Sequence, residues 1–225
     1  MPAANVIQLQ ALLAEKFPGL RLGLDDRPGL AHRTWPTGLP QLDEPLRGGL
    51  PRGALSEIIA PDKCSGSATL LGQLLDRAAD QQGLAALIDG ADSLDVTQLD
   101  ERVLSRLLWV RCRNAEEALK AADLILRDGN LPIVLLDLKA NPAKQLGRIP
   151  ATTWYRLQYL VEETSTVCAV FTPRPMVAPA RARVTLHSHF TLDALERDTA
   201  GLLRDLEMDV AGPARASRES LQNTA

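Results

Sequence analysis

The chain has 225 residues, 45% of them hydrophobic and 24% charged, which is long and apolar enough for a substantial globular core. No apolar run approaches the length of a membrane span, and the N-terminus lacks a basic segment followed by an apolar one. We therefore expect a cytoplasmic protein with no membrane partner. The three cysteines are odd in number and widely spaced, which predicts neither a disulfide framework nor a metal site.

The formal net charge of −3 conceals a segregation of charge along the chain. Between Leu138 and Leu192 there are seven basic residues but only two acidic ones, Glu162 and Glu163. This segment is therefore basic on an otherwise acidic chain, which indicates an anionic partner.

The predicted elements begin with an amphipathic helix over Asn5–Phe17, which a Pro-Gly pair ends. Its apolar face includes Leu9, Leu12 and Leu13. The Gly- and Pro-rich stretch that follows predicts a linker to Pro36. We expect the helix to pack either on a neighbouring molecule or on the chain's own core, and the sequence favours neither.

Short apolar runs then alternate with helical patterns, after a turn-rich segment with a helical piece around Gln41–Leu46. The predicted strands are 54–60, 84–89, 107–111, 131–138, 166–172 and 181–190. The predicted helices are 68–82, 95–106, 115–127 with Asn114 as its N-cap, and 152–163. This alternation predicts an α/β fold with a mostly parallel central sheet flanked by helices, and the continuous apolar run LPIVLLDL predicts a central strand.

A last amphipathic helix is predicted over Asp193–Asp209, with Leu202, Leu203 and Leu206 on its apolar face. The residues after it are polar without an apolar period and are expected to be disordered. We therefore divide the chain into an N-terminal helix and linker (1–36), a core (37–192) and a C-terminal helix with a tail (193–225). The two terminal helices are the predicted partner-binding elements, through Leu9, Leu12, Leu13, Leu202, Leu203 and Leu206.

The stretch from Ala60 to Ala68 has the layout of a phosphate-binding loop, because it joins an apolar strand to an amphipathic helix. It departs from the pattern G-x-x-x-x-G-K-[ST]: alanine replaces the first glycine, the second comes one residue late, and no lysine follows it. We expect neither ATP nor Mg²⁺ as a cofactor. The residues of this degenerate site are Lys63, Ser65, Gly66 and Ser67, with Asp137 at the end of the predicted central strand.

The order of these pieces resembles the core of the RecA recombinases, over roughly 37–190. The matching residues are Thr37-Gly38, Leu42-Asp43, Gly48-Gly49-Leu50-Pro51, Gly53, Glu57-Ile58, Leu87-Ile88-Asp89, Leu94-Asp95 and Asp137. The resemblance implies a RecA-like core with the phosphate loop after the first strand of the sheet.

The resemblance also identifies what the site lacks. It places Ala91 where RecA-like ATPases carry their catalytic glutamate, with Asp92 one residue late, and Thr172 near the position that senses the γ-phosphate. ATP hydrolysis needs a lysine on the phosphates, a hydroxyl on Mg²⁺ and a group that orients water. The resemblance therefore implies a pseudo-ATPase and not an enzyme.

A RecA-like chain of this size with degenerate motifs resembles the ImuA family, which is associated with mutagenic translesion DNA synthesis in the bacterial SOS response. Membership implies a non-catalytic adaptor of an ImuB-like Y-family polymerase homologue, acting with RecA and an error-prone replicative-type polymerase. The N-terminal helix of RecA-type proteins implies a homo-oligomer as a further alternative. The alternatives in other classes are a SulA-like cell-division inhibitor that binds FtsZ, which the chain resembles more distantly, and a divergent DNA-dependent ATPase.

The basic segment covers both positions where RecA-like proteins carry DNA-binding loops. The candidate DNA contacts are Lys139, Lys144, Arg148, Arg174, Arg181 and Arg183, and the alternative is two solvated loops. Tyr155 and Tyr159 are spaced i, i+4 and could stack on bases, but we expect buried packing for them. His187 and His189 alternate on a predicted strand, and no third metal ligand has a suitable spacing.

Overall fold

The computed structural model describes residues 34–62 and 64–212. The predicted helix Asn5–Phe17, with Leu9, Leu12 and Leu13, lies outside the described residues, as do Lys63 and the tail from 213 onward.

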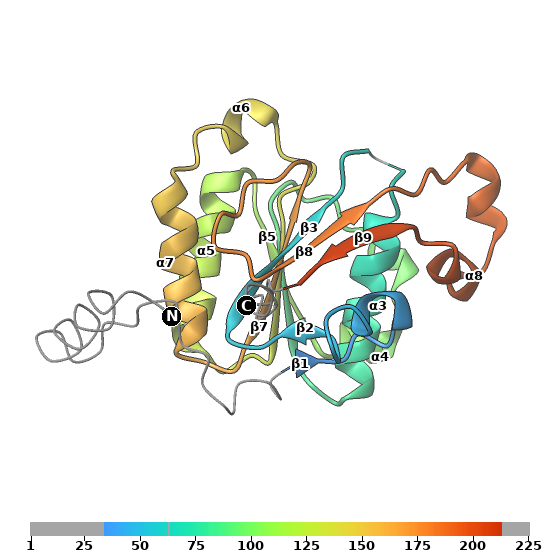
Figure 1. Ribbon diagram of the computed structural model, residues 1–225, viewed down its shortest axis with the longest axis horizontal. Helices are drawn as coiled ribbons and strands as arrows, with labels where there is room; N and C mark the ends of the chain where they lie inside the picture. Colours follow the sequence, from blue (N-terminus) through green and yellow to red (C-terminus); the bar gives the residue numbers. More distant parts are fainter. Residues whose placement is uncertain (1–33, 63, 213–225) are drawn as a thin grey trace, which may run out of the picture. The chain divides into compact units, whose positions relative to one another are not determined.

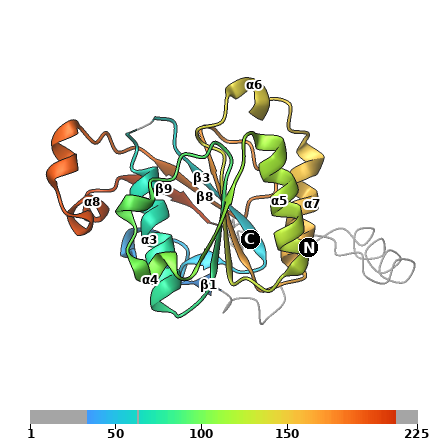
Figure 2. The same ribbon diagram turned by 180° about the vertical axis from the view of Figure 1, so that it is seen from behind.

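A seven-stranded sheet forms the centre of the described structure, with helices on both faces (Figures 1 and 2). Its strands lie in the order β5-β4-β6-β7-β3-β8-β9, and every neighbouring pair is parallel except β8 and β9. Their bounds are β3 Ala54–Ile59, β4 Ala85–Asp89, β5 Leu107–Arg111, β6 Ile133–Asp137, β7 Val167–Thr172, β8 Ala182–Leu186 and β9 Met208–Ala211. The predicted α/β fold with a mostly parallel sheet is confirmed.

The helices form two layers, with α3 and α4 on one face of the sheet and α5 and α7 on the other (Figure 2). Their bounds are α2 Pro40–Asp43, α3 Ser67–Asp80, α4 Glu101–Leu104, α5 Ala115–Asp128, α6 Ala143–Leu146, α7 Ala151–Glu162 and α8 Thr199–Arg204, with 3-10 turns η2 Val96–Gln98 and η3 Leu192–Glu196. A separate antiparallel pair joins β1 (Thr34–Trp35) to β2 (Leu50–Pro51). In the part of the chain that the structure describes, no helix has the length and apolar character needed to cross a bilayer.

The central strand β6 explains why its sequence is apolar at every position. Ile133 and Leu135 pack in the core cluster on the α3 side, whereas Val134 and Leu136 pack in the cluster formed with α5 and α7. Successive side chains of a strand point to opposite faces, so a strand covered on both faces must be apolar at every residue. The prediction from LPIVLLDL is confirmed.

The C-terminal segment differs from the prediction. The expected helix Asp193–Asp209 is wrong: the segment forms η3, then α8, and then β9, which pairs antiparallel with β8. The Asp198 side chain accepts a hydrogen bond from Gly201 N at 3.1 Å and starts α8 as a new, short helix. The open edge of β8 then takes up the backbone of Met208–Ala211, so tertiary pairing overrides a helical pattern that only local spacing supports.

Glu57, in the middle of β3, is fully buried and connects this strand to the carboxyl end of β7, the loop after it and the amino end of β8. Its Oε1 accepts hydrogen bonds from Thr172 Oγ1 at 3.2 Å, Met176 N at 2.6 Å and Val177 N at 2.9 Å. Its Oε2 accepts one from Arg183 Nε at 2.9 Å. A buried carboxylate is tolerated only when it is paired and hydrogen-bonded, so this network fixes the loop between β7 and β8.

Replacing Arg183 by methionine leaves the buried Glu57 carboxylate without its counter-charge. We expect R183M to lower the free energy of unfolding by about 3 kcal/mol, the lower end for a broken buried pair because Arg183 is partly solvated. Denaturant unfolding measures it. The control is R181M, which makes the same change at an exposed arginine two residues earlier and should alter stability by less than about 0.5 kcal/mol. Equal effects of the two substitutions would contradict the role given to the ion pair.

Candidate functional site

The degenerate phosphate loop lies at the carboxyl end of β3 and leads into α3. Ala60 N donates to Thr172 O at 2.8 Å, and Ser65 Oγ donates to Asp62 O at 2.8 Å. Gly66 has a φ of 84° and is the N-cap of α3, a left-handed conformation that glycine adopts without strain. The strand–loop–helix frame of a phosphate-binding loop is therefore present.

The chain's own C-terminal segment covers this loop. A Cβ placed on Gly66 would lie 2.3 Å from Leu206 Cδ1 and 2.8 Å from Phe190 Cε2, and Phe190 N donates to Cys64 O at 3.1 Å. Ser65, Gly66 and Ser67 are all buried. Hydrophobic side chains of the same chain therefore pack against the centre of the loop, whereas Cys64 and Ala68 on either side of it are exposed.

Lys139 supplies an amine to the head of α3 from a different strand. It follows Asp137 by two residues, and its Nζ donates a hydrogen bond to Ser67 Oγ, at the position where the loop lacks its lysine. Lys139 is half-buried, and burial lowers the pKa of its amine. Lys139 is among the predicted DNA contacts, and the structure places its amine at the head of α3. No period or spacing in the sequence indicates this contact.

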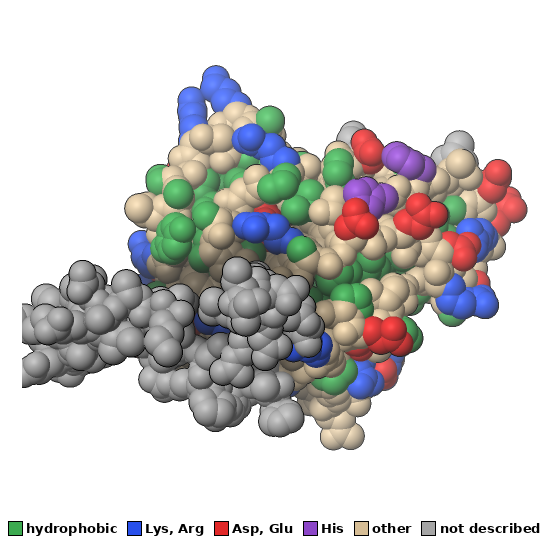
Figure 3. Space-filling view, viewed as in Figure 1, with side chains coloured by type: hydrophobic (Ala, Val, Ile, Leu, Met, Phe, Trp, Pro, Cys, Tyr) green, Lys and Arg blue, Asp and Glu red, His purple; other side chains and the backbone are tan. Residues whose placement is uncertain are grey.

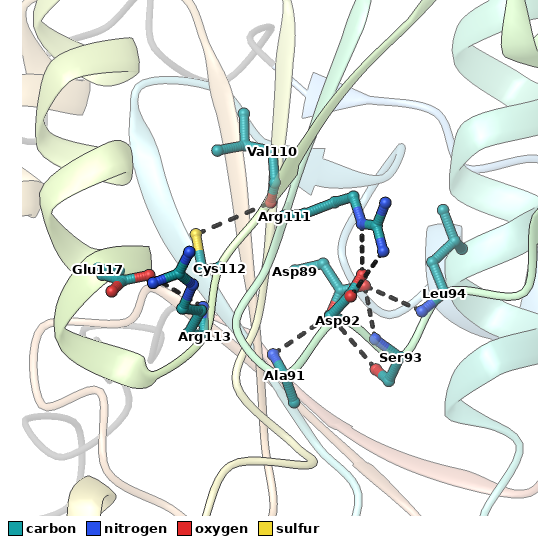
Figure 4. A network of polar contacts seen from close by, with 10 residues as sticks. All are labelled: Asp89, Ala91, Asp92, Ser93, Leu94, Val110, Arg111, Cys112, Arg113 and Glu117. Atoms are coloured by element: carbon teal, nitrogen blue, oxygen red, sulfur yellow. Dashed lines mark hydrogen bonds and ion pairs between the residues drawn. The ribbon is translucent and has the colours of Figure 1, made fainter.

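Asp137 and Asp89 end neighbouring strands beside the loop. Asp137 Oδ1 accepts from Lys139 N at 2.9 Å, and burial raises the pKa of its carboxyl. Asp89 is buried and accepts from Ala91 N at 3.3 Å, Ser93 N at 2.8 Å and Leu94 N at 2.9 Å (Figure 4). Asp89 therefore holds the turn that would carry a catalytic glutamate.

That turn presents no free carboxylate to the loop. Asp92, which has a φ of 52°, accepts from Arg111 Nε at 2.6 Å and from Arg111 Nη2 at 2.7 Å (Figure 4). The hydrogen bond from Arg111 lowers the pKa of the Asp92 carboxyl, and the guanidinium lies 4.8 Å from the centroid of the Trp109 ring. Asp92 is thus bound to the end of β5. Thr172, the residue nearest the sensor position, is fully buried and donates to Glu57 instead.

The candidate DNA-contacting residues divide into separate groups. Lys144, Arg148 and Arg174 are exposed around α6, and a Cβ on Gly147 would lie 3.9 Å from Arg174 Nη2. Figure 3 shows Lys and Arg side chains gathered at the end of the molecule where α6 lies.

The other three basic residues lie elsewhere. Lys139 contacts Ser67, Arg183 pairs with Glu57, and Arg181 precedes β8, whose pairing with β3 begins at Ser56, away from the carboxyl edge. The structure therefore brings together three of the six, and their role in DNA binding stays a prediction.

The candidate partner-binding leucines of the C-terminal segment are only partly accessible. Leu202 and Leu203 are half-buried on α8, whose Leu203 O accepts from Gln41 Nε2 at 2.8 Å, while Leu206 is buried against the phosphate loop. Tyr155 and Tyr159 are 58% and 60% exposed, so the expectation of buried packing for this pair is wrong. Both side chains project from the outer face of α7. The i, i+4 spacing places the two residues on one face of the helix, but it does not determine whether that face is buried or exposed.

His187 and His189 each lie near a carboxylate on the surface. His187 Nε2 is 2.8 Å from Asp209 Oδ2, and His189 Nδ1 is 4.0 Å from Asp62 Oδ2. Over residues 34–62 and 64–212, no three His, Cys, Asp or Glu side chains are grouped so as to hold a metal ion.

A solved structure has a similar architecture. The crystal structure of the RadB recombinase matches with a TM-score of 0.52 and 16% sequence identity, covering 66% of this chain and 81% of that one. At this identity the likeness shows the fold alone, which is a RecA-like α/β core.

Sequence comparisons give the family. RecA from Clavibacter michiganensis subsp. michiganensis is 36% identical over 121 residues, which are 52% of this chain and 33% of that protein. RecA from Mycolicibacterium gilvum is 37% identical over 121 residues, 52% of this chain and 34% of that protein. The match thus spans about a third of the length of these relatives. The model of the RecA N-terminal domain matches residues 19–145, more than half of the chain, which therefore belongs to the RecA N-terminal domain family.

Proposed function

We propose that this chain is a RecA-like accessory protein of mutagenic translesion DNA synthesis that does not turn over ATP. The observation that carries the proposal is the closed phosphate loop, in which Gly66 is packed under Phe190 and Leu206. A polyphosphate needs the backbone N–H groups at the head of a helix to be accessible. In this fold Ser65, Gly66 and Ser67 at the head of α3 are buried, and Phe190 and Leu206 pack against Gly66.

The polar groups near the phosphate loop also support the proposal that the chain does not turn over ATP. Phosphoryl transfer is accelerated by groups aimed at the charge that develops in the transition state. Here Asp92 is bound to Arg111 and Thr172 to Glu57, so each carries out a structural role in place of a catalytic one. An adaptor protein needs the fold and its binding surfaces, but it does not need to hydrolyse ATP.

The proposed partner is an ImuB-like Y-family polymerase homologue, with RecA and an error-prone replicative-type polymerase in the same assembly. This part of the proposal rests on the resemblance of a short RecA-like chain with a degenerate site to the ImuA family. Contact with DNA is secondary in this proposal.

A divergent ATPase is the second candidate function, and Lys139 is the observation that favours it. Its amine reaches Ser67 at the head of α3 and could meet a phosphate charge that the loop itself cannot. This function requires Phe190 and Leu206 to move away from Gly66.

Nucleotide binding separates the two candidates. Because a ligand at 100 times its Kd stabilises a protein by about 2.7 kcal/mol, a bound nucleotide would raise the unfolding temperature visibly. We expect millimolar Mg²⁺-ATP to leave the unfolding temperature unchanged and to release no phosphate, whereas a RecA protein treated in parallel responds. If ATP does stabilise the chain, and K139A abolishes the effect while the exposed control K144A keeps it, the second candidate replaces the first.

The adaptor role is tested with purified components. We expect the full chain to co-elute with the ImuB-like polymerase homologue in size-exclusion chromatography, with or without nucleotide, and to leave FtsZ polymerisation unaffected. Substituting serine at Leu9, Leu12 and Leu13, or at Leu202 and Leu203, distinguishes the two terminal segments as the contact, because apolar anchors carry most interface energy. Failure of the wild-type proteins to co-elute, or suppression of FtsZ polymerisation, would overturn the adaptor proposal.

A further inference from the structure

The loop between β7 and β8, residues 173–181, is fastened to the core along its length. Glu57 accepts hydrogen bonds from Met176 N and Val177 N, and Arg183 Nη2 donates to Val177 O at 2.7 Å. The loop packs against the core cluster on the α7 side of the sheet and runs beside this helix (Figure 1). Because these bonds hold its backbone in one conformation, the outward side chains of the loop form a preorganised surface.

That surface is apolar and poor in hydrogen-bond donors. The apolar residues of the loop that reach solvent are Pro173, Pro175, Met176, Ala178, Pro179 and Ala180. The three prolines have no N–H, and the N–H groups of Met176, Val177 and Ala180 donate to acceptors within the chain. Phosphates are bound by N–H groups and cations, so the middle of this loop does not suit a nucleic acid. It suits an apolar side chain of another protein.

Tyr155 of α7 continues the apolar surface on one side of the loop. Leu55 N donates to Gln158 Oε1 and Arg181 N donates to Leu55 O, both at 2.9 Å, so α7 and the end of the loop meet at one residue of β3. Tyr155 lies about 60° around the helix from Gln158 and is 58% exposed. In Figure 3, hydrophobic side chains gather over α7 and beside it. Tyr155 and the loop therefore border the same part of the surface.

Two arginines flank this surface, and neither is neutralised. Arg174 and Arg181 lie at the two ends of the loop and are exposed. Within the described residues, their side chains make no hydrogen bond and no ion pair. The acid beneath the loop, Glu57, is buried and pairs with Arg183 instead. The two guanidinium groups are therefore available to carboxylates, which arginine can bind through two parallel hydrogen bonds.

One class of ligand matches an apolar surface between two unpaired arginines. A peptide segment with an apolar or aromatic side chain beside acidic residues can pack on the surface and pair with both arginines, which is the electrostatic complementarity of a specific interface. A nucleic acid would use the arginines alone, because the proline and alanine side chains between them offer it no hydrogen bond. Charge and apolarity together thus favour an acidic peptide.

We propose that Tyr155 and the outer face of the loop 173–181 form a docking surface for an acidic segment of a partner protein. An apolar side chain of this segment packs on Tyr155 and the prolines of the loop, and its carboxylates pair with Arg174 and Arg181. The proposal rests on the proposed adaptor function, because it gives that function a contact surface. Its test uses peptides and no ImuB-like protein, so failure of this test and failure of the co-elution are separate results.

Selection from a random peptide library displayed on phage, with the full chain immobilised, tests the surface. We expect the recovered peptides to share an apolar or aromatic residue next to Asp or Glu residues. A labelled peptide of this consensus should bind the chain in fluorescence anisotropy at low salt, and should lose affinity when its acids are replaced by Asn and Gln. Recovery of no such consensus would overturn the proposal.

Charge variants place the peptide on the loop. R174Q combined with R181Q should weaken peptide binding about tenfold, since arginine is among the side chains that most often carry interface energy. The matched control combines R47Q with R113Q, which removes two charges from exposed positions outside the loop and should leave peptide binding unchanged. Equal affinities of the two double variants would contradict the proposal.

An apolar pair of variants tests the other half of the surface. Y155A should also weaken peptide binding about tenfold, because exposed tyrosines are frequent interface anchors. L104A truncates an exposed hydrophobic residue on α4, on the opposite face of the sheet, and should bind the peptide as the wild type does. Unchanged unfolding temperatures show that the variants are folded. The proposal is wrong if Y155A binds the peptide normally, or if the loop variants lose affinity for a labelled single-stranded oligodeoxynucleotide and keep it for the peptide.

Discussion

The fold at the candidate site depends on the buried carboxylate of Glu57. A charge inside the sheet is stable only with several donors, and here these come from Thr172, the backbone of Met176 and Val177, and Arg183. The consequence is that the middle of β3, the carboxyl end of β7 and the amino end of β8 are fixed relative to one another. The same network takes up Thr172 and Arg183, so groups that could otherwise contact a nucleotide or DNA are committed to the structure.

The position of β8 beside β3 determines which segment lies over the phosphate loop. With β8 held beside β3, the chain continues through Phe190 and returns as β9, and Leu206 packs onto Gly66. Glycine at this position, which a phosphate-binding loop needs so that the ligand can approach, here allows side chains of the same molecule to approach. The amine of Lys139 at Ser67 completes a site whose contacts are internal.

The parts of this arrangement that follow local rules could be predicted from sequence. Continuous apolarity identified β6 as a central strand, and Asn114 caps α5 as expected, accepting from Glu117 N at 2.9 Å. The errors arise where distant contacts decide. Met208–Ala211 is a strand because β8 offers an open edge. Lys139 reaches α3 because β6 and β3, with β7 between them, end at the same edge of the sheet. Neither contact leaves a period or a spacing in the chain.

The two helix layers of the fold differ in what they leave exposed to solvent. On the α3 side of the sheet, Phe190 and Leu206 of the segments after β8 pack against Gly66 of the phosphate loop. On the other side, α5 and α7 cover the sheet with their inner residues, while Tyr155 and Tyr159 stay outside. Because the inner residues of α5 and α7 supply the packing against the sheet, their outer face stays exposed to solvent and can serve as an interaction surface.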